Sequence, residues 1–371
     1  MLVLTKLEKG KTGFENLLKY KIVMSVQVLV VDDSAVARGI ISNFLDDDPD
    51  IDVIGVAKNG KEAIDFTTQL RPDLITMDIN MPVMDGLAAT EHIMAHQPTP
   101  ILIVSSLVKS EVDLAFRAMS LGALDAMEKP SFDQFSAKDA DELVRKVKLL
   151  SQVPVVTHLE GKRRNRLAES VPAKDYTSLA TSNRFQVVAI GSSTGGPKAL
   201  HKVLSQLPVD FPSGILVVQH ISEGFTSGLV DWLDRVSRVS VKEAEEGDKI
   251  QPGVVLIAPH DSHMMVVSGG RIRLNKALPI KGHRPSANVL FSSMAKVYNK
   301  NGIGVILTGM GEDGATGLVE MRKSGSTTIV QDEDSSVIFG MPKAAIEMGA
   351  AEEILPIDEI GKFLIHSVMD S

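Results

Sequence analysis

The chain has 371 residues, of which 44% are hydrophobic and 23% charged, so it is long enough for two globular domains. It contains no cysteine, which excludes disulfides, thiolate nucleophiles and cysteine-bound zinc and favours a cytoplasmic location. A net charge of −8 opposes nucleic-acid binding, and no apolar run is long enough for membrane insertion.

Residues 1–23 contain lysines and scattered apolar residues but no continuous apolar segment of the kind that a secretory signal requires. We expect them to form an extension outside the fold. Met24 stands directly before the first strand signal, so translation is expected to start there.

Residues 24–148 alternate short apolar runs with amphipathic stretches. The runs cover 26–32, 51–57, 73–79, 101–106 and 123–129. Between them, apolar residues recur at helical spacing, as in Val36, Ile40 and Phe44. This alternation predicts an α/β domain whose five-stranded parallel sheet is doubly wound, with helices on both faces.

Polar side chains close several of these predicted strands. Asp32 and Asp33 end the first strand, Asp78 the third, Ser105 the fourth and Lys129 the fifth. Ligands bind at the carboxyl edge of such sheets, where these groups converge. Three carboxylates repel one another unless a cation lies among them, and Mg²⁺ prefers such oxygen ligands. The pattern predicts a Mg²⁺ site and a phosphoryl-accepting carboxylate.

These residues, together with the segment Asn80–Gly86, resemble a two-component receiver domain. The resemblance implies that Asp78 accepts the phosphoryl group from a histidine kinase. It implies a metal site of Asp32, Asp33 and Asp78, and phosphoryl contacts from Ser105 and Lys129. Receivers often have a switching aromatic where this chain has Ala126, so a different relay of phosphorylation is expected.

Residues 149–184 interrupt the strand and helix pattern with Pro154, Pro172 and several serines and threonines, which predicts a linker. The basic run Lys162–Arg166 lies within it. We interpret this run as a solvated part of the linker in preference to a partner-binding patch.

Residues 185–371 resume the alternation. Apolar runs cover 187–190, 214–219, 253–259, 302–308 and 326–331, and an alternating segment surrounds Gly269-Gly270. The pattern predicts a Rossmann-like α/β domain with a mostly parallel sheet and an antiparallel hairpin. No basic recognition helix is evident, which argues against a DNA-binding output.

Gly191–Gly195 matches G-x-S-x-G, the pattern of a nucleophilic serine on a strand-to-helix turn. Neither phosphate-binding glycine motif is complete at this turn, so a phosphate cradle is less favoured. His220 ends the next strand, and Asp313 follows strand 302–308, with Glu312 as its competitor. Ser193, His220 and Asp313 together predict a catalytic triad.

Each of these residues also has a structural interpretation, such as a helix cap or a strand-end histidine. Their placement on strand ends of one sheet favours the triad. His260 and His263 lie three apart but lack the other residues of a zinc motif, so a zinc site is not supported.

The segments around the triad, including His283–Ser286 and Leu307–Gly314, resemble the catalytic domain of the chemotaxis protein-glutamate methylesterases. The resemblance implies a cofactor-independent serine esterase acting on methyl-accepting chemotaxis receptors, with glutamine deamidation as a second activity. It places Thr194 and Met310 in the site lining, and His283 and Arg284 along the substrate groove. The alternative is a catalytically idle module that docks on receptors.

Overall fold

The computed structural model describes residues 25–106, 109–129, 137–155, 186–222 and 224–369. The predicted extension 1–23, the basic run 162–166 and most of the predicted linker lie outside these residues. Among the described residues, no helix combines the length and apolarity needed to cross a bilayer.

The first half contains a five-stranded parallel sheet, as predicted. Its strand order is β2-β1-β3-β4-β5. The strands are β1 (Val26–Val31), β2 (Ile51–Ala57), β3 (Leu74–Met77), β4 (Ile101–Ser105) and β5 (Asp125–Glu128). The helices are α1 (Ala35–Asp46), α2 (Gly60–Leu70), α3 (Gly86–His96), α4 (Lys109–Ser120) and α5 (Ala137–Leu150).

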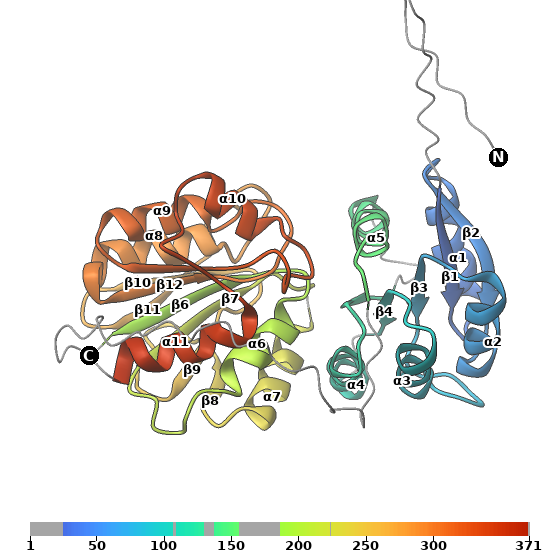
Figure 1. The fold of residues 1–371 in the computed structure, drawn as a ribbon, viewed down its shortest axis with the longest axis horizontal. Helices are drawn as coiled ribbons and strands as arrows, with labels where there is room; N and C mark the ends of the chain where they lie inside the picture. Colours follow the sequence, from blue (N-terminus) through green and yellow to red (C-terminus); the bar gives the residue numbers. More distant parts are fainter. Residues whose placement is uncertain (1–24, 107–108, 130–136, 156–185, 223, 370–371) are drawn as a thin grey trace, which may run out of the picture.

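Local sequence explains where the first three helices begin. Ser34, Asn59 and Asp85 precede α1, α2 and α3, and each side chain accepts a hydrogen bond from a backbone amide of the first turn. α1 and α5 cover one face of the sheet, whereas α2, α3 and α4 cover the other (Figure 1). The domain is therefore doubly wound, which confirms the predicted fold class.

The second half contains a seven-stranded sheet in the order β14-β13-β12-β6-β7-β9-β8, with parallel pairing throughout. Its strands are β6 (Val187–Ser192), β7 (Gly214–Gln219), β8 (Ser240–Glu243), β9 (Val254–Ile257), β12 (Gly302–Ile306), β13 (Thr327–Gln331) and β14 (Glu353–Leu355). The predicted hairpin is present as a separate antiparallel pair, β10 (His263–Val267) and β11 (Arg271–Asn275).

Two groups of helices enclose this sheet (Figure 1). One face carries α6 (Gly196–Leu204), α7 (Thr226–Val236) and α11 (Ile357–Met369). The other carries α8 (Ala287–Val297), α9 (Ala315–Lys323), α10 (Met341–Glu347) and the hairpin, with the 3₁₀ turn η1 (Asn299–Asn301) before β12. Loops follow the carboxyl ends of the central strands, and side chains on these loops can form a site.

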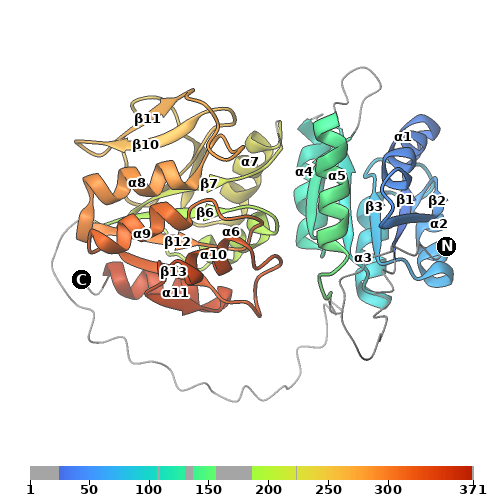
Figure 2. The same ribbon diagram turned by 90° about the horizontal axis from the view of Figure 1, so that it is seen from above.

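The two halves pack together through α4, which lies against α6 and α7 (Figure 2). Phe116 of α4 stacks on Trp232 of α7 with ring centroids 5.5 Å apart. Asp113 of α4 forms an ion pair with Arg235 of α7. Apolar side chains continue through this contact without a break, so one hydrophobic core spans both halves.

Candidate functional site

The topology brings three sequence-distant residues to neighbouring strand ends. β12, β6 and β7 are adjacent in the sheet. Ser193 follows β6, His220 follows β7, and Asp313 lies in the loop after β12. The three predicted triad residues therefore lie at one edge of this sheet.

Backbone contacts fix the turn that carries Ser193. The amide of Ser193 donates to the carbonyl of Thr308 at 3.1 Å, and the amide of Gly196 donates to the carbonyl of Ser193 at 2.7 Å. Gly195 has a φ of 75°, and a Cβ on Gly196 would lie 2.0 Å from the Gln219 side chain. Gly195 and Gly196 thus permit the tight turn that carries Ser193.

Gln219 is a residue of the site to which the sequence analysis assigned no role. Its Oε1 accepts from Ser192 Oγ at 2.6 Å, and its Nε2 donates to the carbonyls of Ser193 at 2.8 Å and His220 at 2.7 Å. This buried amide ties the serine turn to the end of β7. The only sequence signal for it was its position directly before His220.

Asp313 is buried and accepts four hydrogen bonds. Its donors are His220 Nε2 at 2.9 Å, Ser286 Oγ at 2.7 Å, and the amides of Ala287 at 2.6 Å and Asn288 at 3.2 Å. Burial raises the pKa of this carboxyl, but the hydrogen bonds outweigh it and lower the pKa to about 2. The start of α8 therefore holds Asp313 ionised.

Of the two ring nitrogens of His220, only Nε2 has a hydrogen-bond partner in the described part of the chain. Nε2 faces Asp313, while Nδ1 is buried and has no hydrogen-bond partner among the described residues. If Nε2 carries the proton, Nδ1 is left to accept one. No hydrogen bond joins His220 to Ser193 in the described residues, as is common in catalytic sites without substrate.

Glu312, the competitor of Asp313, lies elsewhere. Its carboxylate pairs with Lys281, and its side chain is 56% exposed. Among the described residues, Glu312 forms no hydrogen bond or ion pair with His220. The geometry therefore favours Asp313 as the partner of the imidazole.

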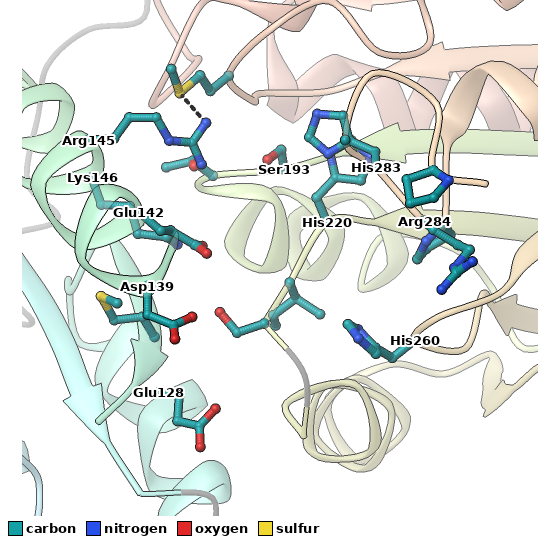
Figure 3. A pocket seen from close by; sticks show the side chains of 18 of the residues that line it. Glu128, Asp139, Glu142, Arg145, Lys146, Ser193, His220, His260, His283 and Arg284 are labelled. Carbon is teal, nitrogen blue, oxygen red and sulfur yellow. Dashed lines mark hydrogen bonds between the residues drawn. The ribbon is translucent and has the colours of Figure 1, made fainter. Parts of the chain in front are cut away.

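A pocket of about 600 Å³ opens in front of Ser193 and His220 (Figure 3). Thr194, Met310, His283 and Arg284, the other residues predicted for the site, all line it. Arg284, however, is held by Asp261, with Nε 2.8 Å from Oδ1, and by the carbonyls of Lys276 and Ala277. Most of its hydrogen-bonding capacity thus serves the surrounding loop.

The first half supplies one wall of the same pocket (Figure 3). The contributing residues, from β5 to α5, are Met127, Glu128, Lys129, Asp139, Glu142, Arg145 and Lys146. Arg145 Nη1 lies 3.0 Å from the sulfur of Met310. The two halves therefore share the pocket, and access to Ser193 depends on how they pack.

A second polar cluster lies at the carboxyl edge of the first sheet. Asp32, Asp33 and Asp78 place ligand oxygens within 4.8 Å of one another. Lys129 Nζ contacts Asp32 Oδ2 at 2.8 Å and Asp78 Oδ2 at 3.0 Å. Ser105 is buried at the end of β4. The structure thus brings these five predicted residues to one edge of the sheet.

Two carboxylates of this cluster, those of Asp32 and Asp78, are unfavourably buried. Burial raises the pKa of Asp78 to about 6, with Asp32 adding to the rise and Lys129 opposing it. Burial also raises the pKa of Asp32, again against the effect of Lys129. One ammonium therefore does not fully compensate the two buried acids, and a divalent cation would. The donor set fits Mg²⁺, which prefers carboxylate oxygens.

Ala126 is buried in β5, next to the strand that ends in Ser105. Its methyl group cannot act as a rotating aromatic ring. Phe116 in α4 makes ring contacts with Trp232 and Phe225 of the second half. If phosphorylation shifts α4, it would therefore also shift an aromatic contact between the two halves.

Comparison with known proteins agrees with both resemblances. Residues 188–364 match the family described as CheB methylesterase, and residues 28–138 match the response regulator receiver domain. A protein-glutamate methylesterase/protein-glutamine glutaminase 1 of Syntrophus aciditrophicus is 44% identical over 346 residues, covering 92% of this chain and 97% of that protein. The protein-glutamate methylesterase/protein-glutamine glutaminase of Pyrococcus horikoshii is 41% identical, covering 92% and 94%.

Among solved structures, the CheB methylesterase catalytic domain of Thermotoga maritima is 42% identical. It covers 49% of this chain and 98% of that domain, with a TM-score of 0.48. The identity and coverage of the full-length relatives are sufficient to assign the family. The chain belongs to the protein-glutamate methylesterase/protein-glutamine glutaminase family, with a receiver domain joined to a CheB methylesterase domain.

Proposed function

We propose that this chain is a phosphorylation-controlled serine esterase that hydrolyses glutamate γ-methyl esters on methyl-accepting chemotaxis receptors in the cytoplasm. The observation that carries the proposal is the hydrogen bond from His220 to Asp313. It leaves Nδ1 able to accept a proton, and His220 lines the same pocket as Ser193. A base oriented by a buried carboxylate is what a serine nucleophile requires.

In the proposed reaction, Ser193 Oγ attacks the ester carbonyl while His220 Nδ1 takes its proton. The tetrahedral intermediate collapses as the C–O bond to methanol breaks, and His220 returns the proton to the leaving oxygen. Water, activated by the same imidazole, then cleaves the glutamyl ester on Ser193 and releases glutamate. Asp313 stabilises the imidazolium in both halves of the cycle.

The amides of the serine turn are the proposed donors to the oxyanion. Those of Ser193 and Gly196 already donate to backbone carbonyls. The amide of Thr194 has no hydrogen-bond partner among the described residues and lies at the start of α6, where the helix dipole favours negative charge. Thr194 is therefore the first candidate, which refines the broader expectation from the sequence.

The same site suits glutamine side chains. An amide carbonyl has the same planar geometry as the ester, and ammonia replaces methanol as the leaving group. Deamidation of receptor glutamines is therefore proposed as the second activity.

We propose that the receiver domain controls access to the pocket. Asp78 accepts a phosphoryl group from a histidine kinase, and Mg²⁺ held by Asp32, Asp33 and Asp78 would neutralise charge on that group. Lys129 contacts Asp78 and also lines the pocket, so the two sites are joined by one side chain. A tenfold activation needs only about 1.4 kcal/mol of differential stability between packed and open states.

Methanol release from methylated receptor, with and without a small phosphodonor, tests both parts. Ser193→Ala is expected to lower kcat by up to ~10⁶. Ser205→Ala, at the exposed far end of α6, serves as the matched control and retains activity. Asp78→Asn is expected to abolish stimulation by the phosphodonor.

An idle docking module would release no methanol from the wild-type protein in either condition. Stimulation that persists in Asp78→Asn would contradict the receiver switch, and near-normal methanol release by Ser193→Ala would contradict the nucleophile.

A further inference from the structure

His283 stacks on His220. The two imidazoles are 4.1 Å apart between centroids and 3° from parallel (Figure 3). We infer that His283 is a positioning residue for the base, not the substrate-groove residue expected from the sequence. This inference rests on the proposed esterase function.

The stack supplies a constraint that the hydrogen bond to Asp313 cannot. A single bond at Nε2 fixes one point of the His220 ring but leaves the ring free to turn about that bond. Nδ1 would then change its direction as the ring turns. A flat ring on one face of His220 opposes this rotation and holds Nδ1 in one orientation, which is the preorganisation that proton transfer requires.

The loop that presents His283 is built to hold it still. The backbone of Ile280 and His283 exchanges two hydrogen bonds of 3.0 Å each, and the intervening Lys281 and Gly282 have φ values of 48° and 88°. These values are those of a tight hairpin turn. Arg284 then anchors the loop to Asp261. The role of Arg284 is therefore to support His283.

The stack also favours the charged form of the base. When His220 takes the proton of Ser193, it becomes an imidazolium between the carboxylate of Asp313 and the ring face of His283. A cation over an aromatic face is stabilised by the ring quadrupole. Because this stabilisation arises only once His220 is protonated, it acts in the transition state and contributes to kcat, not to KM.

Two substitutions separate this role from substrate binding. His283→Phe keeps a flat ring but removes both nitrogens, whereas His283→Ala removes the ring. We expect His283→Ala to lower kcat by about 10-fold with KM nearly unchanged, and His283→Phe to stay within about threefold of wild type. His96→Ala is the matched control, because His96 stacks on His92 at 4.2 Å on an exposed helix of the receiver domain.

Two results would contradict the positioning role of His283. If His283→Phe is as impaired as His283→Ala and KM rises in both, His283 binds substrate through a nitrogen. If neither variant changes kcat, the stack has no role in the reaction. Thermal unfolding of each variant identifies any loss of folding, and His283→Phe then carries the test, since it preserves the volume of the ring.

A second readout does not depend on the glutamyl substrate. Reaction of Ser193 with phenylmethylsulfonyl fluoride requires the serine and its base but no receptor. We expect the sulfonylation rate to fall about 10-fold in His283→Ala and to be retained in His283→Phe. If wild type reacts in this way but releases no methanol, the proposed substrate is wrong and the stack is still tested. Equal sulfonylation rates in all three proteins would overturn the inference.

Discussion

The receiver site and the esterase site both bury aspartates at the carboxyl edge of a parallel sheet, but the two environments shift their pKa values in opposite directions. Asp78 has a pKa raised to about 6, whereas that of Asp313 is lowered to about 2. Burial opposes ionisation at both positions. Asp313 has four hydrogen-bond donors, whereas Asp78 has the amide of Ile79 and a lysine that it shares with Asp32, whose negative charge raises the pKa of Asp78 further.

The difference shows that burial alone does not predict the charge of an aspartate. The number of donors around each carboxylate decides the sign of the pKa shift. The ionised, preorganised state of Asp313 fits its proposed role, which is to stabilise the imidazolium in every cycle. The incompletely compensated charge of Asp78 fits its proposed role, which is to bind a metal and then accept a phosphoryl group.

Replacing Asp313 is expected to have the largest effect. Asp313→Asn retains the size of the side chain but removes the charge that holds the imidazolium and fixes its tautomer, so kcat should fall by ~10⁴. The rate of methanol release from methylated receptor measures this loss of kcat. Glu312→Gln is the matched control, because the neighbouring carboxylate is exposed and pairs with Lys281. Comparable activity in both variants would show that Asp313 does not serve the base.

The pH dependence of stability offers the next largest test. The pKa of Asp313 lies below its ordinary value of 3.8, so its contribution to folding is complete above about pH 4 and is lost as pH falls towards 2. This lowering of the pKa corresponds to about 2 kcal/mol of the free energy of unfolding. In urea unfolding, wild type should lose this advantage over Asp313→Asn between pH 4 and pH 2.

The metal-free receiver should behave in the opposite way. The raised pKa of Asp78 means that its unfavourable burial is relieved as pH falls through about 6. Asp78→Asn should therefore exceed wild type in stability at neutral pH, with the gap narrowing in acid. A constant difference between these two proteins from pH 8 to pH 4 would contradict the proposed environment of Asp78.

A further test concerns the contact between α4 and α7, which joins the two halves. A Cβ on Gly228 of α7 would lie 2.2 Å from Cγ1 of Val112 in α4, so Gly228→Ala must displace Val112 and is expected to loosen the packing of these helices. We expect basal methanol release to rise by about 10-fold, equivalent to ~1.4 kcal/mol of lost packing. Trp232, the only tryptophan, should report the loss of its stack on Phe116 by a change in fluorescence.

Gly39→Ala provides the control for this variant. Gly39 also lies in a helix, but a Cβ there would meet nothing within 4 Å. Both substitutions favour helix formation, yet only Gly228→Ala should alter activity. If basal activity and fluorescence stay unchanged in Gly228→Ala, α4 does not restrain the second half.

Much of this arrangement was accessible from the sequence, because strand periodicity and strand-end residues carry strong signals. The edge strands β8 and β14 were missed, since both have only three or four residues and owe their conformation to pairing with a neighbour. Gln219 and Ser286 were not identified as partners of the triad. Their roles depend on contacts between residues distant in sequence, which no local pattern encodes.

His283 illustrates the same limit within the site. His283 lines the pocket in the structure, but the sequence could not specify what its ring contacts. The packing of α4 on α7 was likewise not predictable, because an interface between domains leaves no periodic pattern of its own. Placement of residues at strand ends follows from topology, whereas side-chain pairing follows from three-dimensional packing.

The smallest expected effect is that of Mg²⁺ on the receiver site. A ligand that binds only the folded state at about ten times its Kd stabilises that state by ~1.4 kcal/mol. Thermal unfolding with and without Mg²⁺ should show this shift in wild type. Asp33→Asn should lose most of it, because Asp33 is the exposed member of the cluster and can be changed with little effect on the core.

Asp65→Asn, on the exposed face of α2, should retain the shift and serves as the control. Basal methanol release should not respond to the ion, because Asp313 is already compensated by four donors and the esterase site is proposed to need no cofactor. An equal Mg²⁺ shift in Asp33→Asn would place the ion elsewhere. An Mg²⁺-dependent basal activity would remove the contrast between the two sites, since both would then rely on a cation to balance their carboxylates.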